Sequence, residues 1–202
     1  GGTTARDESS APHAAYTVFV KDSAGAPIDR VPILTRETGA LGSSLTLRPG
    51  GYFDAHGNPG HDATQVVTDA SGRTQVILLV NEETQLLAAH PDYVIQRTKL
   101  VPVAGDRNEL HLSLVPAAQV IGKVVDRNGL PVKDVGVGAY PSNRGISGRQ
   151  TPEYRAVSNA DGEFHMVALS PGSYRFRLTG GSTATSWSES TELAVGKNST
   201  QL

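Results

Sequence analysis

The chain contains no cysteine, so disulfides, thiolate metal sites and thiol catalysis are all excluded. Aromatic residues make up only 5% of the sequence, and only one of them is a tryptophan. The chain also has a single methionine. No apolar run approaches the roughly 18 residues that a transmembrane helix needs. Net charge is also small, at -2, whereas a nucleic-acid partner favours a clustered basic face. These absences point away from thiol enzymes, membrane-spanning helices and nucleic-acid-binding proteins.

Glycine and proline, by contrast, are frequent, with 22 and 12 residues, as in proteins built from short strands and turns. The stretch 157–178 shows the pattern most clearly. Apolar side chains alternate there with polar ones in two runs, Phe164 and Met166, then Tyr174, Phe176 and Leu178. A period of two predicts strands with one apolar and one solvated face, and therefore an all-β fold.

An internal duplication sets the domain organisation. Four residues of the first half return 104 positions later: Asp22, Gly25, Pro27 and Val31 match Asp126, Gly129, Pro131 and Val135. The segment 68–72 likewise matches 158–162. We therefore expect a polar N-terminal tether at 1–14, a first sandwich at 15–116 with an inserted loop at 36–65, and a second sandwich at 117–202. The short connection near 115–118 predicts end-to-end stacking with limited freedom.

These residues resemble the carboxypeptidase regulatory-like domains, also described as transthyretin-like or prealbumin-like. The second repeat carries nearly all of that pattern: Asp126, Gly129, Pro131, Asp161, Gly162, Phe164, Leu169, Pro171, Gly172 and Tyr174. The first repeat keeps Asp22, Gly25, Pro27, Asp69 and Gly72 but lacks the Pro-Gly-x-Tyr element. The resemblance implies two tandem seven-stranded, Greek-key β-sandwiches of immunoglobulin-like shape. It also implies accessory, non-catalytic modules of exported or cell-surface proteins.

The motif residues are expected to shape turns and not to bind ligands. Gly25 and Gly129 can adopt the positive φ of a tight turn without strain at a Cβ atom. Asp22, Asp126 and Asp161 are expected to accept backbone hydrogen bonds in Asx-type turns. The segment 81–89 has helical propensity, but its place in the repeat matches the strand 174–178, so we predict a strand.

The inserted loop holds the candidate ligands. Asp54, His56, His61 and Asp62 offer imidazole and carboxylate groups that suit zinc or a similar divalent ion. Their spacing matches no established metal motif, so a solvated polar loop is the alternative. Apart from such a metal, no cofactor is expected.

Aromatic residues are the other candidates for binding. Tyr52 and Phe53 would form a platform for a sugar or a partner protein, and Trp187 is either a half-buried core residue or a sugar platform. No Gly-x-Ser-x-Gly elbow or acid–base constellation is present, so we expect no enzyme.

The C-terminal ends of the two repeats differ. Aligning 103–110 with 195–202 leaves the strand 110–114 of the first repeat without a counterpart, which predicts that the second sandwich lacks its last strand. Such a gap exposes backbone groups and part of a core. A continuing chain, a short strand and a strand donated by another subunit all remain open.

The leading expectation is a non-catalytic structural or adhesive module of an exported bacterial cell-envelope protein. One alternative is a subunit of an extracellular filament assembled by strand addition or end-to-end stacking. Another is a carbohydrate-binding module that uses Tyr52, Phe53 or Trp187. The Gly- and Ser-rich start is typical of the segment behind a lipidated cysteine, which predicts a tether through a residue preceding Gly1; a signal-peptidase product is the alternative. Expected partners are other proteins, including copies of this chain, or a glycan.

Overall fold

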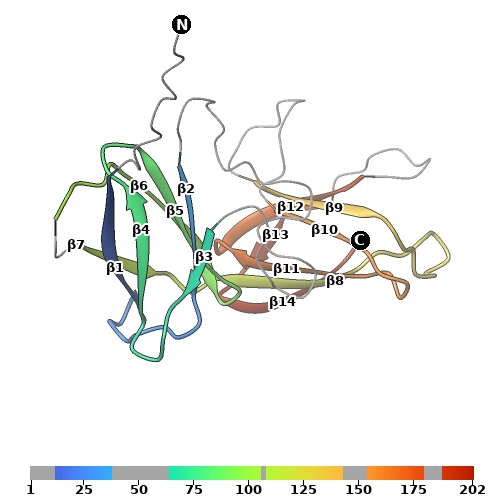
Figure 1. Ribbon diagram of the computed structural model, residues 1–202. Coiled ribbons are helices and arrows are strands. Elements are labelled where there is room, and N and C mark those ends of the chain that lie inside the picture. The colour runs from blue at the N-terminus through green and yellow to red at the C-terminus, as the bar shows by residue number, and fades with distance from the viewer. Residues whose placement is uncertain (1–11, 38–63, 106–107, 143–153, 180–187) are drawn as a thin grey trace, which may run out of the picture.

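The computed structural model describes residues 12–37, 64–105, 108–142, 154–179 and 188–202, and every regular element in them is a strand (Figure 1). Seven strands come from the first repeat: β1 (His13–Asp22), β2 (Pro32–Glu37), β3 (Thr64–Val67), β4 (Arg73–Leu79), β5 (Thr84–His90), β6 (Tyr93–Leu100) and β7 (Asn108–Leu114). Seven come from the second: β8 (Ala118–Lys123), β9 (Gly136–Pro141), β10 (Tyr154–Val157), β11 (Glu163–Leu169), β12 (Gly172–Thr179), β13 (Thr191–Leu193) and β14 (Gly196–Gln201). The predicted all-β fold is confirmed.

The strands form four sheets, two in each repeat. The first repeat, called here the first module, has a three-stranded sheet β4-β1-β7 and a four-stranded sheet β3-β2-β5-β6. The second module has β11-β8-β14 and β10-β9-β12-β13, the same orders with every number raised by seven. Two tandem β-sandwiches of one topology are therefore present. The exact limits at 15–116 and 117–202 stay our proposal.

Each module has its own core between its two sheets. In the first module, Val18 and Leu86 are among the side chains with at most 1% exposure. In the second, Phe164 and Phe176 pack with their ring centroids 6.4 Å apart. The Phe164 ring lies over Gly122, where a Cβ atom would come within 2.1 Å of it, so that strand position excludes any side chain. Full burial of such an apolar side chain stabilises the fold by about 1.5–3 kcal/mol.

The turns after β1 and β8 have the predicted chemistry. The Oδ1 atoms of Asp22 and Asp126 each accept hydrogen bonds from the backbone N–H groups two and four residues later, at 2.8–2.9 Å. Gly25 and Gly129 have φ angles of 88° and 80°. These angles confirm the predicted need for glycine, because only glycine adopts them without strain.

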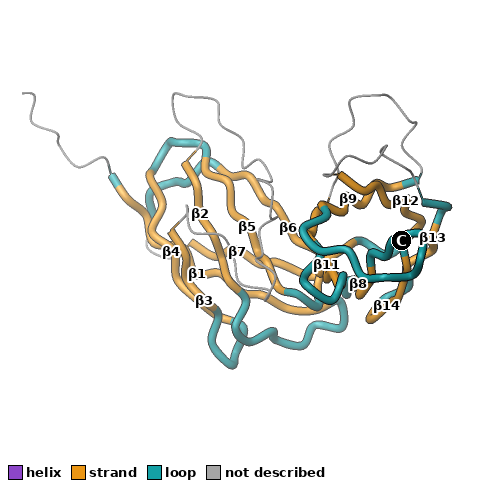
Figure 2. Tube along the Cα trace, turned by 90° about the vertical axis from the view of Figure 1, so that its right-hand side faces the viewer, coloured by secondary structure: helices purple, strands orange, loops and turns teal. Residues whose placement is uncertain are grey.

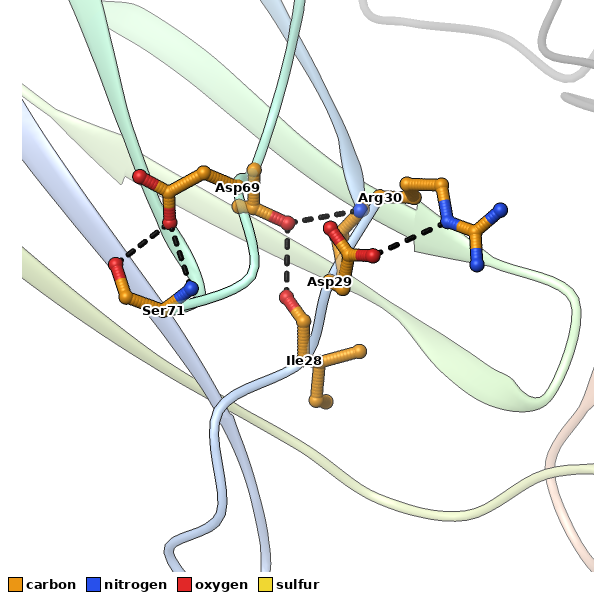
Figure 3. A network of polar contacts seen from close by, with 7 residues as sticks. Ile28, Asp29, Arg30, Asp69 and Ser71 are labelled. Carbon is orange, nitrogen blue, oxygen red and sulfur yellow. Dashed lines mark hydrogen bonds and ion pairs between the residues drawn. The ribbon is translucent and has the colours of Figure 1, made fainter.

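The prediction for Asp161 was wrong. Asn159 is the acceptor: its Oδ1 takes the backbone N–H groups of Asp161 and Glu163, at 3.0 and 2.8 Å. Its counterpart Asp69 accepts in the same way from the backbone and hydroxyl of Ser71 (Figure 3). The repeat places Asn159, and not Asp161, opposite Asp69. Hydrogen bonds, the Ser71 hydroxyl first among them, hold the pKa of Asp69 below its usual value.

The last strand of the second module, predicted to be missing, is present as β14. It runs parallel to β8, as β7 runs parallel to β1. Asn198 lies opposite Val120, and Asn108 lies opposite Tyr16. The two ends therefore align through their asparagines, two residues away from the alignment made on the sequence.

That strand escaped notice because its inward positions lack apolar side chains. Gly196, Asn198 and Thr200 occupy positions that alternate with exposed residues, and Leu202 is the first large apolar group. Hydrogen bonds from Leu202 N to Lys123 O (2.9 Å) and from Val125 N to Leu202 O (3.0 Å) continue the ladder. Backbone pairing defines this strand, and a search for alternating apolar residues does not detect it.

β5 confirms the strand predicted within 81–89. It is buried on both faces: Leu86 and Ala88 belong to the core of the first module, while Leu87 and Ala89 belong to a separate cluster. Strands buried on both faces have continuous apolar runs and no alternation. The second cluster lies at the junction between the modules.

Candidate functional site: the junction between the modules

The ligand candidates from the sequence lie outside the described residues. Tyr52, Phe53, Asp54, His56, His61 and Asp62 belong to 38–63, and Trp187 belongs to 180–187. Their roles stay predictions. Within the part of the chain that the structure describes, no three His, Asp or Glu side chains gather closely enough to hold a metal ion. No helix in that part has the length and apolarity of a bilayer span.

The two modules meet through a buried apolar cluster. Leu34 of β2 and Leu87 and Ala89 of β5 point outward from the four-stranded sheet of the first module. Ala168 of β11 packs against them, and all four side chains have at most 3% exposure. The modules therefore share an apolar contact of the kind that holds a single domain together.

The turn between β5 and β6 adds hydrogen bonds across this contact. The carbonyl of Pro91 accepts the N–H of Ala168 at 3.1 Å, and the carbonyl of Asp92 accepts the N–H of Ala117 at 2.8 Å. The Asp92 carboxylate accepts a third bond, from Gln119 Nε2 at 2.6 Å. The first module thus holds both the start of β8 and the end of β11.

Ala168 reaches this turn through a distortion of its own strand. The register of β11 shifts between Met166 and Leu169, as in a β-bulge, and Ala168 has a φ of 60°. That left-handed conformation costs a non-glycine residue roughly 1–2 kcal/mol. The bulge aims the Ala168 N–H at Pro91 and its methyl group into the cluster, so the junction offsets the cost.

The arrangement differs from the expected end-to-end stacking. In Figure 1, β1, β2 and β4 stand upright, while β8, β9 and β11 run roughly horizontally to their right. Figure 2, turned by 90°, shows β6 of the first module next to β11 of the second, and the two strands are in contact. One end of the second module thus rests on the outer face of a sheet of the first. The apolar outward side chains of β5 are the physical reason.

His90 sits at the edge of this junction. It is half-buried, its ring meets that of Tyr93 edge-on at 5.3 Å, and its Nδ1 accepts the Asp92 N–H at 3.2 Å. Burial lowers the pKa of His90, the Asp92 carboxylate opposes that shift, and Arg30 adds to it. The ring is therefore neutral at neutral pH.

The first and last strands of each module are parallel neighbours. Tyr16 to Asp22 of β1 pair with Asn108 to Leu114 of β7, and Ala118 to Lys123 of β8 pair with Gly196 to Gln201 of β14. The chain enters each module at one end of such a ladder and leaves at the other. A pull on the two chain ends therefore slides the strands past one another and loads all their hydrogen bonds together.

Sequence reasoning missed the junction. The available signals were the unbroken apolar run 86–89, which needs cover on both faces, and the His-Pro-Asp turn behind it. Neither signal identifies the covering element, since Ala168 takes part only through an unusual backbone angle. No local sequence pattern predicts a positive φ angle at an alanine.

No protein-family model and no curated protein matches the chain. Among solved structures, it is similar to a streptococcal ancillary pilin (16% identity, TM-score 0.38, 93% of this chain and 62% of that one). It is also similar to a minor pilin of Streptococcus agalactiae (12%, 0.34, 94% of both chains). A 3-chlorocatechol 1,2-dioxygenase from Rhodococcus opacus matches at 13% identity and a TM-score of 0.38 over 55% of this chain and 62% of that one. Likenesses this weak assign no family and leave the function to the chain's own geometry.

Proposed function

We propose that this chain is a load-bearing, non-catalytic part of an exported bacterial cell-envelope protein. The observation that carries the proposal is the parallel pairing of the first and last strands in both modules. Six or seven consecutive register pairs in each ladder resist a pull on the chain ends together. In a ladder opened from one end, the bonds break one after another and each gives way at a lower force.

The junction supports the same role. The buried cluster around Leu87 and the hydrogen bonds at Pro91 and Asp92 connect the modules with no flexible linker between β7 and β8. A force or an orientation imposed on one module therefore passes directly to the other. The relation to carboxypeptidase regulatory-like domains, the extracellular location and the tether before Gly1 belong to this proposal.

Single-molecule pulling tests the role directly. Pulled between its chain ends, the protein should unfold at a higher force than when pulled across one end of the β1–β7 ladder. Handles for the second geometry attach at Lys21→Cys and Ser113→Cys, which are paired in register and unique because the chain has no other cysteine. Equal forces in the two geometries would contradict a load-bearing ladder.

A second candidate, strand addition in a filament, is favoured by the edge position of β14 in its sheet. Gly196 and Leu202 direct their N–H groups to β8, so the intervening Lys197, Ser199 and Gln201 direct theirs to the open edge. Lys197→Pro removes one such donor and leaves the bonds to β8 in place. Concentration-dependent filaments in electron micrographs that this variant abolishes would support the candidate. A monomer by light scattering at all concentrations would remove it.

A further inference from the structure

Three arginines gather on one face of the second module. Arg155 of β10 and Arg177 of β12 are both register partners of Gly138 on the strand between them, β9. The three residues form one cross-strand row, and glycine leaves its centre without a side chain. Arg175 lies two residues along β12, opposite Tyr140.

All of these residues lie on the outer face of the four-stranded sheet. Their neighbours Val137, Ala139 and Phe176 fill the core of the module, and successive side chains of a strand point to opposite faces. Arg155 is exposed, and Arg175 and Arg177 are half-buried. Tyr140 is buried at 6% exposure, so the arginines are the more exposed side chains of these two rows.

A cluster of three serine hydroxyls continues the same face. Ser190 Oγ lies 2.8 Å from Ser142 Oγ and 2.6 Å from Ser173 Oγ. Ser173 lies two residues before Arg175 on the same face of β12, and Ser142 lies two residues after Tyr140, just beyond the end of β9. We call the three arginines and three serines the arginine–serine stripe. From the row of Gly138 to that of Ser142 it runs about 13 Å, at roughly 3.3 Å per residue.

Two of the three arginines of the stripe have no ion-pair partner among the described residues. Arg155 and Arg175 form no ion pair with any residue that the structure describes. Glu192, the register partner of Ser173, is an acidic residue at the serine end of the stripe. A chain whose net charge is -2 thus concentrates three positive charges on one sheet face.

We propose that the arginine–serine stripe binds an acidic polysaccharide. Guanidinium groups pair bidentately with carboxylate or sulfate groups, which both occur on such polymers. Serine hydroxyls donate and accept hydrogen bonds, as sugar hydroxyls do. The length of the stripe suits two or three sugar rings laid along the strands. An acidic peptide would match the arginines but would make no special use of three clustered hydroxyls. This site is separate from the load-bearing ladders and goes beyond the proposed function.

Binding measurements by calorimetry test the site with four probes. Dextran sulfate and polygalacturonate distinguish sulfate from carboxylate as the recognised group, neutral dextran controls for the sugar backbone, and poly-L-glutamate stands for an acidic peptide. At least one acidic polysaccharide should bind, more weakly as salt is added, because the charges are screened. The proposal would be overturned if poly-L-glutamate bound as tightly as both acidic polysaccharides. It would also be overturned if neither acidic polysaccharide bound.

Variants locate the binding on the stripe. Arg155→Ala with Arg177→Ala should weaken polysaccharide binding at least tenfold. If the double variant fails to fold, Arg155→Ala alone is the fallback variant. Arg155 is exposed on an edge strand, and its loss should weaken binding several-fold. Arg73→Ala with Arg127→Ala removes the same charge from exposed positions elsewhere and should leave the affinity unchanged. Equal losses in the two pairs would show that net charge, and not this site, attracts the polymer.

Discussion

Gly72 and Gly162 occupy the tightest backbone positions of the two modules. Their φ angles are 71° and 74°, and a Cβ atom would approach the carbonyl oxygens of Val20 and Val124 to 2.4 and 2.5 Å. Gly25 and Gly129 share the left-handed conformation but have open space around the missing side chain. Glycine thus serves two purposes here, conformational freedom at one turn and close backbone approach at the other.

Gly162→Ala should therefore destabilise the second module more than Gly129→Ala does. The left-handed conformation costs either variant roughly 1–2 kcal/mol. Only Gly162→Ala must also displace the Val124 carbonyl, which is held by the N–H of Val132 at 3.0 Å. Urea denaturation of both variants measures the difference. Equal losses would contradict the close approach.

Thr68 and Ser158 form the same buried hydrogen-bond pair in the two modules. Thr68 Oγ1 donates to Ile28 O at 2.8 Å and accepts from Val31 N at 2.9 Å. Ser158 Oγ makes the equivalent bonds to Val132 O and Val135 N, at 2.8 and 3.0 Å. The hydroxyl group therefore performs the role, and the methyl group of threonine is not needed for it.

Thr68→Val should reduce the free energy of unfolding by about 1–3 kcal/mol, because two buried backbone groups lose their partner. Thr68→Ser keeps the hydroxyl and should restore most of that stability. Thermal or urea unfolding of the two variants decides the matter. A valine variant as stable as the serine variant would show that the backbone groups find other partners.

Turn chemistry was the most predictable part of the residue scale. The positions of Gly25, Gly129, Asp22 and Asp126 follow from what glycine and aspartate do in any tight turn. The prediction for Asp161 failed because Asn159, two residues earlier, is equally able to accept backbone hydrogen bonds. Only the alignment of the two repeats shows which of the two residues is the acceptor.

Among the elements, β14 depends on one side chain to an unusual degree. Asn198 Nδ2 lies 2.8–3.2 Å from the carbonyl oxygens of Gln119, Ala194 and Gly196, and its Oδ1 accepts the Ala194 N–H at 3.0 Å. Few apolar side chains hold this strand in place, so the asparagine fixes where it begins.

Asn198→Ala should release β14 while the rest of the second module stays folded. The amide of Val125, which donates to Leu202, should then lose its protection against hydrogen exchange. The amide of Val120 is a control inside β8, which also pairs with β11. Unchanged protection at Val125 would mean that backbone pairing alone holds the strand.

Strands with one apolar face were predictable, and those without one were not. β11 and β12 alternate and were found at once. β5 is apolar on both faces and β14 on neither, so period-two reasoning fails on each for opposite reasons. Position in the repeat identified β5 correctly, whereas an alignment shifted by two residues led to the wrong prediction that β14 is missing.

For the whole molecule, we expect the stability of the junction to depend on pH, because the half-buried His90 lies at its edge. Burial holds the folded-state pKa of His90 below the ordinary value of 6.5. The unfolded chain therefore takes up a proton at higher pH than the folded chain does. The stability that neutral His90 contributes is complete above that value and is lost as pH falls through 6.5 toward the lower folded pKa.

We expect acidification to weaken the contact of the His90–Tyr93 turn with the second module. Small-angle scattering from pH 7.5 to pH 5 should show the molecule becoming more extended. His90→Asn keeps an acceptor for the Asp92 N–H without titrating and should reduce the change. His165, whose pKa is lowered by burial and by Lys197, lies away from the turn, so His165→Asn is the matched control. A scattering profile independent of pH would contradict the expectation.

Because the first strand of each module pairs with its last strand, a module can complete its fold only after its last strand has been made. β1 stays without its partner β7 until Asn108 and the residues after it have been made or exported, because Tyr16 pairs with Asn108. Contacts this distant in sequence are slow to form, since loop closure must precede them. A chain delivered from its N-terminus thus completes the first module while the second is still unfolded. The outer face of β5 is then already formed when the second module folds. The second module docks on it last, through Ala168.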